Sequence, residues 1–368
     1  MRNHMIIQSL ELKDYRNYRS LSIEFNKNIN ILFGNNAQGK TNILEALYMC
    51  ATTKSHKGSK DKEMIRFKQD EAHLRLYLQK KEISHKIDMH LKKNKTKGVA
   101  IDGISIKKSS ELFGLLNIVF FSPEDLSIIK NGPSERRKFM DLELCQLDKI
   151  YFYNLSKYNK ILVQRNNLLK QIKSNPSLID TLDIWDEQLV NYGINIIKKR
   201  EEFIVLLNKI IYQIHQKLTG GLEKIKVEYD PSVKEKEFHK ELSKKRELDL
   251  KNLFTYVGPH KDDISFYVNG IDIRKFGSQG QQRTAALSLK LAEIELVKKI
   301  INDTPILLLD DVLSELDKNR KNYLLDSIND VQTIITCTDF DFRYSCDKFR
   351  VDCGRIIYNE NSLESSLV

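Results

Sequence analysis

An eight-residue glycine-rich run near the start of the chain has the spacing of a phosphate-binding loop. Gly34 to Thr41 read GNNAQGKT, which matches the pattern G-x-x-x-x-G-K-T. In such a loop the glycines let backbone N–H groups surround phosphates, the lysine reaches the β- and γ-phosphates, and the threonine hydroxyl can bind Mg²⁺. A glycine-rich turn from strand to helix, without a ligand, is the alternative. We predict ATP and Mg²⁺ as ligands, with these nucleotide-binding residues: Gly34, Asn35, Asn36, Ala37, Gln38, Gly39, Lys40, Thr41 and Asn42.

Two adjacent carboxylates near the other end of the chain could complete such a site. Asp310 and Asp311 directly follow the apolar run Ile306 to Leu309, which predicts a buried strand. Open α/β sheets bind ligands at the carboxyl ends of their strands. We expect Asp310 to bind the Mg²⁺ together with Thr41, and Asp311 to orient the attacking water. The predicted catalytic residues are therefore Lys40 and Asp311, although Asp311 could instead cap a helix or be solvated.

A third polar segment precedes a predicted amphipathic helix. Ser278, Gln279, Gly280 and Gln281 lie just before a run of leucines that begins at Leu287. The N–H groups and the positive dipole at the start of a helix favour a phosphate. We predict that these four residues also contact nucleotide. An ordinary helix N-cap at Ser278 is the simpler alternative.

The elements that must position these residues are indicated by hydrophobic periodicity. A short apolar strand at 30–33 enters the glycine loop, and alternating segments up to residue 121 predict an antiparallel sheet. Asn269-Gly270 predicts a two-residue hairpin between 264–268 and 271–273. Apolar residues spaced by alternating fours and threes, broken by the turn at 174–176, predict an antiparallel helical hairpin. Its expected core is Tyr151, Leu155, Tyr158, Leu162, Arg165, Leu169, Ile172, Leu182, Trp185, Leu189, Tyr192 and Ile196.

The three motifs together resemble those of ABC-type ATPases. GNNAQGKT, SQGQQRT and ILLLDDVLSELD look like the Walker A, signature, and Walker B with D-loop motifs. Four further segments resemble the RecF family in particular, which is related to Rad50 and SMC proteins: DYRNY at 14–18, FSPEDL at 121–126, GPSERR at 132–137 and GPHKDD at 258–263. The resemblance implies an α/β fold, an ABC-type P-loop ATPase head with a mixed sheet, an antiparallel sheet and an inserted antiparallel helical arm.

The same resemblance implies a division of the chain into three parts. Residues 1–133 would form an N-terminal ATPase lobe with Walker A, and 134–220 the helical arm. Residues 221–368 would carry the signature motif, Walker B and D-loop and complete the head. Residues 359–368 are expected to form a frayed tail.

The resemblance also implies a mechanism. Ser278 would contact the γ-phosphate held by a second subunit, giving an ATP-dependent homodimer, and Arg16 would approach the phosphates. The family resemblance implies a DNA-binding recombination mediator with a slow, DNA-stimulated ATPase. It would bind duplex DNA near single-strand gaps, and with RecR and RecO it would promote RecA loading in gap repair, replication restart and the SOS response. No glutamine occupies the Q-loop stretch around Glu124 and Asp125, and no switch histidine precedes Asp339, so slow hydrolysis is expected.

Two other classes of protein remain open from the sequence. An ABC transporter ATPase subunit would share the Walker motifs, but such heads are not interrupted by a helical arm. A structural scaffold like an SMC or Rad50 head would need much longer coiled coils.

The composition favours an acidic partner. The 368 residues carry 60 Lys and Arg against 50 Asp and Glu, a formal charge of +10, which suits DNA. No apolar run reaches the ~18 residues of a membrane span, no signal peptide is evident at the N-terminus, and five scattered cysteines indicate neither disulfides nor zinc. We expect a cytoplasmic, nucleoid-associated protein, with Met1 and Met5 both possible as starts. The predicted DNA-binding residues, which could also be merely solvated, are Lys54, Lys57, Lys60, Lys92, Lys93 and Lys95.

Overall fold

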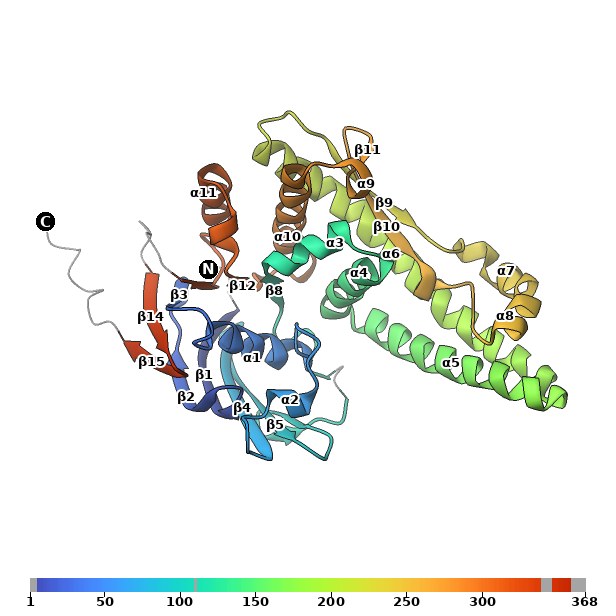
Figure 1. Cartoon of the computed structure of the whole chain (residues 1–368), viewed down its shortest axis with the longest axis horizontal. Helices are drawn as coiled ribbons and strands as arrows, with labels where there is room; N and C mark the ends of the chain where they lie inside the picture. Colours follow the sequence, from blue (N-terminus) through green and yellow to red (C-terminus); the bar gives the residue numbers. More distant parts are fainter. Residues whose placement is uncertain (1–4, 109–110, 339–345, 359–368) are drawn as a thin grey trace, which may run out of the picture. The chain divides into compact units, whose positions relative to one another are not determined.

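The structure, a computed structural model, describes residues 5–108, 111–338 and 346–358. The chain folds into two compact units, Met1–Glu124 with Val297–Val368, and Asp125–Leu296 (Figure 1). The predicted arm, 134–220, therefore lies within the second unit together with 221–296. The expected tail at 359–368 and the position of Asp339 lie outside the described residues.

A six-stranded mixed sheet forms the centre of the first unit, in the order β15-β14-β3-β13-β12-β8. Every neighbouring pair is parallel except the antiparallel pair β14 and β15. Parallel strands covered on both faces are apolar throughout, which explains the runs INILF and ILLLD. Because β13 lies between β3 and β12, the carboxyl ends of β3 and β12 meet at one edge of the sheet. The strands are β3 Ile29–Phe33, β8 Ile118–Phe121, β12 Ile306–Asp310, β13 Thr333–Cys337, β14 Cys346–Asp352 and β15 Arg355–Tyr358.

The predicted antiparallel sheet is present in the same unit. Its order is β2-β1-β4-β5-β6-β7, and all neighbours are antiparallel. Along β4, from Glu71 to Leu76, exposed and buried side chains alternate, because one face covers the core and the other meets solvent. The strands are β1 Ile6–Tyr15, β2 Tyr18–Glu24, β4 Glu71–Lys80, β5 Ile83–Lys92, β6 Gly98–Ile101 and β7 Ile104–Ser105.

Helix α1, Lys40–Thr52, contacts both sheets of this unit. It packs against β4 of the antiparallel sheet and against β8, β12 and β13 of the mixed sheet. Eleven of its thirteen residues are buried, so the helix is almost wholly a core element. The remaining helices of the unit are short: α2 Asp61–Met64, the 3-10 turn η6 Val312–Glu315 and α11 Lys318–Ser327.

The second unit contains the predicted helical hairpin. Helices α5, Lys149–Ser174, and α6, Leu182–Leu218, pack along each other and are joined by the 3-10 turn η3, Pro176–Thr181 (Figure 1). None of the helices in the described ranges is long and apolar enough to cross a membrane. Five further helical elements of this unit are α3 Leu126–Lys130, α4 Pro133–Leu147, η4 Glu235–Glu237, α7 Phe238–Lys244 and α8 Arg246–Asn252. The 3-10 turn η2, Pro123–Asp125, precedes α3 and contains the boundary between the two units.

The core of the hairpin differs in detail from the predicted heptad pattern. Four of the predicted core residues, Leu155, Leu162, Trp185 and Tyr192, are only half-buried, whereas Asn154 and Ile161, next to the first two, are buried. A straight α-helix has 3.6 residues per turn, so its buried stripe drifts away from a strict seven-residue repeat. The prediction of a hairpin was right, but the assignment of these four half-buried residues to its core was wrong.

A three-stranded sheet follows the hairpin, in the order β11-β10-β9. The strands are β9 Ile225–Asp230, β10 Asp263–Val268 and β11 Ile271–Asp272. Asn269 and Gly270 both have positive φ, 50° and 81°, which confirms the two-residue hairpin turn. Helices α9, Ile273–Phe276, and α10, Gln279–Ile301, come next, and α10 runs from the second unit into the first.

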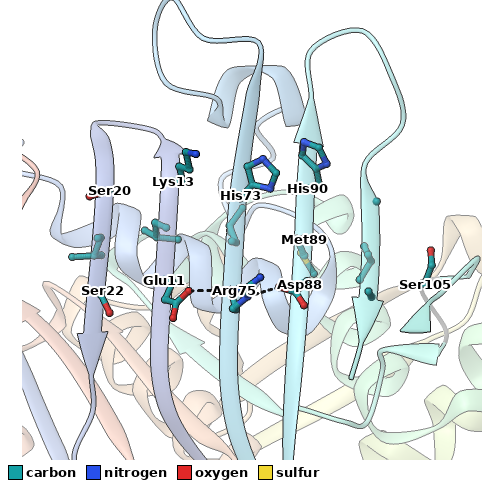
Figure 2. A pocket seen from close by; sticks show the side chains of 16 residues that line it. Glu11, Lys13, Ser20, Ser22, His73, Arg75, Asp88, Met89, His90 and Ser105 are labelled. Carbon is teal, nitrogen blue, oxygen red and sulfur yellow. Dashed lines mark hydrogen bonds and ion pairs between the residues drawn. The ribbon is translucent and has the colours of Figure 1, made fainter. Parts of the chain in front are cut away.

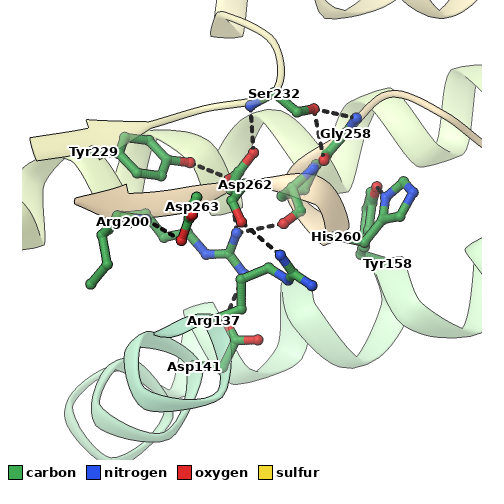
Figure 3. Close-up of polar contacts among 12 residues, drawn as sticks. Arg137, Asp141, Tyr158, Arg200, Tyr229, Ser232, Gly258, His260, Asp262 and Asp263 are labelled. Carbon is green, nitrogen blue, oxygen red and sulfur yellow. Dashed lines mark hydrogen bonds and ion pairs between the residues drawn. The ribbon is translucent and has the colours of Figure 1, made fainter. Parts of the chain in front are cut away.

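The GPHKDD segment, which includes the 3-10 turn η5 Pro259–Lys261, is held by buried ionic contacts (Figure 3). Arg200 of α6 donates from Nη1 to Asp262 Oδ2 at 2.8 Å and from Nη2 to Asp141 Oδ1 at 2.7 Å. The Tyr229 hydroxyl donates to the same Asp262 carboxylate. Arg200 and Asp262 are almost fully buried, so removing Arg200 would leave the Asp262 carboxylate in the core without this cationic partner. The segment is therefore a structural junction between α4, α6 and β10.

Candidate nucleotide-binding site

The glycine loop at 34–39 needs glycine at two positions for steric reasons. Gly34 has a φ of 142° and Gly39 a φ of 112°. A Cβ atom at Gly34 would lie 2.4 Å from the carbonyl oxygen of Val351, and one at Gly39 would lie 2.5 Å from Asn17 Nδ2. Side chains at either position would therefore displace backbone or the neighbouring turn, so the loop can keep this curvature only with glycine.

Two turns that the sequence analysis did not assign to the site hold the glycine loop. Asn17 Nδ2 and the backbone N–H of Gly354 both donate to the carbonyl oxygen of Gln38, at 2.9 and 3.1 Å. The Tyr18 hydroxyl donates to the carbonyl oxygen of Gly39 at 3.1 Å. Asn17 and Tyr18 belong to the DYRNY segment and could have been found from it. The contact of Gly354 depends on the β14–β15 pairing and has no local sequence signal.

Lys40 lies where a lysine of a phosphate-binding loop should be. Its Nζ donates to the carbonyl oxygens of Gly34 and Asn35, at 2.6 and 2.9 Å, so the side chain folds back over the loop. The residue is 4% exposed. The ammonium group and the N-terminus of α1 both offer positive charge to this loop. These contacts are consistent with the predicted role of Lys40, which stays a prediction.

The two halves of the candidate site meet at Thr41 and Asp310. Thr41 Oγ1 donates to Asp310 Oδ1 at 2.8 Å, and Thr336 Oγ1 of β13 donates to the same oxygen at 2.8 Å. Hydroxyl and carboxylate oxygens are the hard donors that Mg²⁺ prefers. The residues present at this edge of the sheet therefore fit a Mg²⁺ site.

Asp311 is the next residue and has a strained backbone, with a φ of 53°. Its backbone N–H donates to Thr336 Oγ1 at 3.0 Å, and it makes no side-chain cap to the following 3-10 turn. Burial and the adjacent Asp310 carboxylate raise the pKa of Asp311, while Lys40 opposes them. A carboxylate with a raised pKa accepts a proton more readily, which suits the predicted role in orienting and deprotonating water.

Arg16, predicted to approach the phosphates, is held by α1. Its Nε and Nη2 each donate to one oxygen of the Glu45 carboxylate, at 2.7 Å, and its Nη1 donates to the carbonyl oxygen of Glu63 at 3.0 Å. Burial raises the pKa of Glu45, but the hydrogen bonds from Arg16 and Ser55 outweigh it, so the net pKa is lowered. Nucleotide contact by Arg16 stays a prediction.

His56 lies in sequence between two of the predicted DNA-binding lysines, Lys54 and Lys57, but does not add to their positive charge. Its ring stacks on Phe120, with the centroids 4.1 Å apart, and burial lowers the pKa of His56 to about 4. The residue is therefore neutral at physiological pH. A histidine next to several lysines gave no sign of this, because its stacking partner Phe120 is distant in sequence.

The signature segment lies in the second unit, where Ser278 caps helix α10. Ser278 Oγ accepts a hydrogen bond from the backbone N–H of Gln281, and Gln281 Oε1 accepts one from the backbone N–H of Ser278. This reciprocal arrangement is a capping box. The alternative of an ordinary N-cap therefore holds within one chain, and contact of Ser278, Gln279, Gly280 or Gln281 with a partner's nucleotide stays a prediction.

The predicted DNA-binding lysines form two exposed groups joined by Lys97. Lys97 Nζ donates to the carbonyl oxygen of Thr53 at 2.5 Å and to Asp61 Oδ1 at 2.8 Å, which ties the turn at 93–97 to the segment after α1. Lys97 is therefore an anchor for the turn. All but one of the six predicted residues are exposed, and Lys92 is half-buried: Lys54, Lys57, Lys60, Lys92, Lys93 and Lys95. Their contact with DNA stays a prediction.

The mixed sheet, the P-loop and the two aspartates define the class of this chain as an ABC-type ATPase head of the SMC kind. The family model described as RecF/RecN/SMC N terminal domain matches residues 6–350. A solved Smc head domain with an extended coiled coil from Pyrococcus furiosus is 16% identical with a TM-score of 0.56, covering 96% of each chain. At that identity the likeness shows the fold alone.

Closer relatives identify the family within this class. The DNA replication and repair protein RecF of Agathobacter rectalis is 64% identical over 348 residues, covering 95% of this chain and 96% of its own. RecF of Lachnoclostridium phytofermentans is 62% identical, covering 92% of this chain and 94% of its own. A solved structure of the recombination mediator RecF with ATP is 36% identical, with a TM-score of 0.93, covering 98% and 99%. The chain belongs to the RecF family.

Proposed function

We propose that this chain is an ATP-dependent recombination mediator that dimerises on ATP and binds duplex DNA near single-strand gaps. The observation that carries the proposal is the 2.8 Å hydrogen bond between Thr41 and Asp310, which brings the two ends of the chain to one candidate nucleotide site. The solved structure of a related RecF with ATP supports ATP as the nucleotide. Membership of the RecF family favours this function over a transporter subunit or a long-armed scaffold.

The residues around the loop have distinct tasks in this proposal. Backbone N–H groups of 34–39 and the Lys40 ammonium hold the phosphates, and Thr41 with Asp310 hold Mg²⁺. The bound ion neutralises charge on the β- and γ-phosphates. Asp311 orients the attacking water and accepts its proton. Hydrolysis is slow and DNA-stimulated, so the ATP-bound state persists long enough to act as a signal.

The dimer forms when the signature segment of one subunit meets the nucleotide of the other. Ser278 and the free N–H groups at the start of α10 then contact the γ-phosphate, as helix N-termini do. Each nucleotide contacts residues of both subunits, so ATP stabilises the dimer and hydrolysis releases it.

The closed dimer holds duplex DNA through the lysines at 54–60 and 92–95. By family relationship the partners are RecR and RecO, through which the protein promotes RecA loading during gap repair, replication restart and the SOS response. It acts in the cytoplasm, at the nucleoid. A charge of +10 and the absence of base-reading motifs favour sequence-tolerant binding.

Sedimentation of the Ser278→Arg variant with ATP and Mg²⁺ tests the proposal. The arginine would fill the space that a partner's nucleotide must enter, so the variant should bind ATP but stay monomeric. Two controls separate this from loss of the helix cap: Ser278→Ala loses the cap without added bulk, and Ser177→Arg adds the same side chain at an exposed serine of η3. An ATP-dependent dimer of Ser278→Arg as stable as the original would contradict the sandwich mechanism.

A further inference from the structure

Two histidines lie side by side on the solvent-facing side of the antiparallel sheet (Figure 2), and a glutamate lies close to both. His73 of β4 and His90 of β5 are direct partners in the strand register, and Glu71 lies two residues before His73, on the same face. His73 and His90 also line a groove of about 710 Å³ on this face. Nothing in the proposed ATPase or DNA-binding function uses these side chains.

The three side chains already point their ligand atoms at one another. His90 Nε2 lies 2.5 Å from Glu71 Oε2, and His73 Nε2 lies 3.9 Å from the same oxygen. The two imidazole rings are stacked, with centroids 3.9 Å apart and planes 23° from parallel. One ligand atom from each residue can be chosen so that all three lie within 4.8 Å of one another.

These separations are close to what a single metal ion requires. Zinc binds histidine nitrogen and carboxylate oxygen at about 2.0–2.2 Å, so two ligand atoms around a tetrahedral ion are about 3.4 Å apart. Small side-chain rotations would lengthen the 2.5 Å distance between His90 and Glu71 and shorten the 3.9 Å distance between His73 and Glu71, so that both approach this tetrahedral separation. The strands themselves need not move, because directly paired residues on one face are already neighbours.

We propose that Glu71, His73 and His90 bind a divalent transition-metal ion, with Zn²⁺ as the best fit, separate from the Mg²⁺ of the nucleotide site. Two imidazoles and one carboxylate leave the fourth position of a tetrahedron to water, since Glu71 and His73 are exposed to solvent and His90 is only half-buried. Imidazole ligands disfavour Mg²⁺ and Ca²⁺, which take oxygen. The nearby Lys13 and Lys92 repel a cation and limit the affinity.

The ion would join β4 to β5 at the end of the sheet that carries the basic turn. β5 ends at Lys92, next to the turn at 93–97, and Glu71 pairs with Lys92 in the register. A bound metal therefore holds the base of this turn, and metal binding should stabilise the folded chain, since the three ligands come together only after folding.

Calorimetric titration of the tag-free, full-length protein with Zn²⁺, after treatment with a chelator, tests this site. We expect one ion per chain at this site, and a loss of affinity of at least about tenfold in His73→Ala and His90→Ala. His85→Ala is the matched control, because His85 is on β5 and pairs with the Asp102 carboxylate, but points to the opposite face. Zn²⁺ should raise the Tm of the original protein and of the His85→Ala control. It should raise the Tm of His73→Ala and His90→Ala much less.

Cobalt spectroscopy separates this site from the five cysteines. Co²⁺ bound by nitrogen and oxygen gives no sulfur-to-metal charge-transfer band, whereas a cysteine site does. If Zn²⁺ affinity is equal in the original and in both histidine variants, or if the original binds no Zn²⁺, the proposal is wrong. The Tm of the two histidine variants, measured in chelator, should equal that of the original protein. This result would show that a loss of Zn²⁺ binding is not caused by unfolding.

Discussion

Thr41 Oγ1 and Asp310 Oδ1 lie 2.8 Å apart, joined by a hydrogen bond between residues 269 positions apart in sequence. The contact forms because β3 and β12 are parallel strands separated only by β13, so their carboxyl ends share one edge of the sheet. Thr336 at the end of β13 donates to the same carboxylate oxygen and fixes its orientation. The site therefore depends on the order of three strands from two distant parts of the chain.

Replacing Lys40 by Met should weaken ATP binding about 10- to 100-fold, the size expected for loss of a hydrogen bond to a charged group. Its Nζ contacts only loop carbonyls among the described residues, so the fold should persist. Calorimetry with ATP and Mg²⁺ measures the effect. Lys54→Met, at an exposed lysine after α1, should bind ATP normally; equal affinity in both variants would exclude the assignment of the loop lysine.

Asp311→Asn should slow single-turnover hydrolysis by about 10²- to 10⁴-fold while ATP still binds, because the amide cannot accept a proton. Its backbone N–H keeps the bond to Thr336, and Asp310 is unchanged. The ATP-bound dimer of the variant should therefore outlast that of the original in sedimentation. Unchanged hydrolysis would move the role to Glu124, Asp125 or Asp339.

The salt dependence of DNA binding should show whether Lys92, Lys93 and Lys95, in and next to the 93–97 turn, contact DNA phosphates. Each phosphate contact contributes about −0.9 to the slope of log K against log salt. Changing Lys92, Lys93 and Lys95 to Gln should flatten the slope, and Lys97 is left intact because it anchors the turn. The control variant changes three exposed lysines of the second unit, Lys234, Lys236 and Lys240. If both triple variants give the same slope, the turn does not contact DNA.

Mild acid should destabilise the chain partly through His260. Burial lowers the pKa of His260 to about 4, and its Nδ1 and Nε2 contact the Tyr158 hydroxyl at 2.7 Å and the Thr255 carbonyl oxygen at 2.9 Å. The unfolded chain binds a proton near pH 6.5, so stability is complete above that pH and is lost as the pH falls toward 4. The loss between pH 7 and pH 5 should be about 2 kcal/mol from this residue.

Urea denaturation at both pH values measures this loss. His260→Gln should show a smaller difference between pH 7 and pH 5 than the original. His239→Gln, at an exposed histidine, should show the original difference. An equal loss in His260→Gln and the original would mean that other groups account for the acid sensitivity.

Several local features were predictable from the sequence because short-range physics determines them. The Gly34 to Thr41 loop needs residues without a Cβ at fixed positions, and the Asn269-Gly270 turn needs two positive φ angles. The apolar strands before Lys40 and Asp311 and the helical hairpin also follow from periodicity alone. The residues that bind phosphate and metal could thus be proposed before any fold was known.

Tertiary structure alone decided which distant residues meet. The pairing of Arg16 with Glu45, the burial that makes His56 neutral, and the anchoring of the basic turn by Lys97 all depend on packing between elements far apart in the chain. The pairing of His73 with His90 depends on strand register, since a shift of one residue would turn one histidine to the other face of the sheet. Residue types and spacing determine the chemistry that each segment can offer, whereas register and packing determine which segments act together.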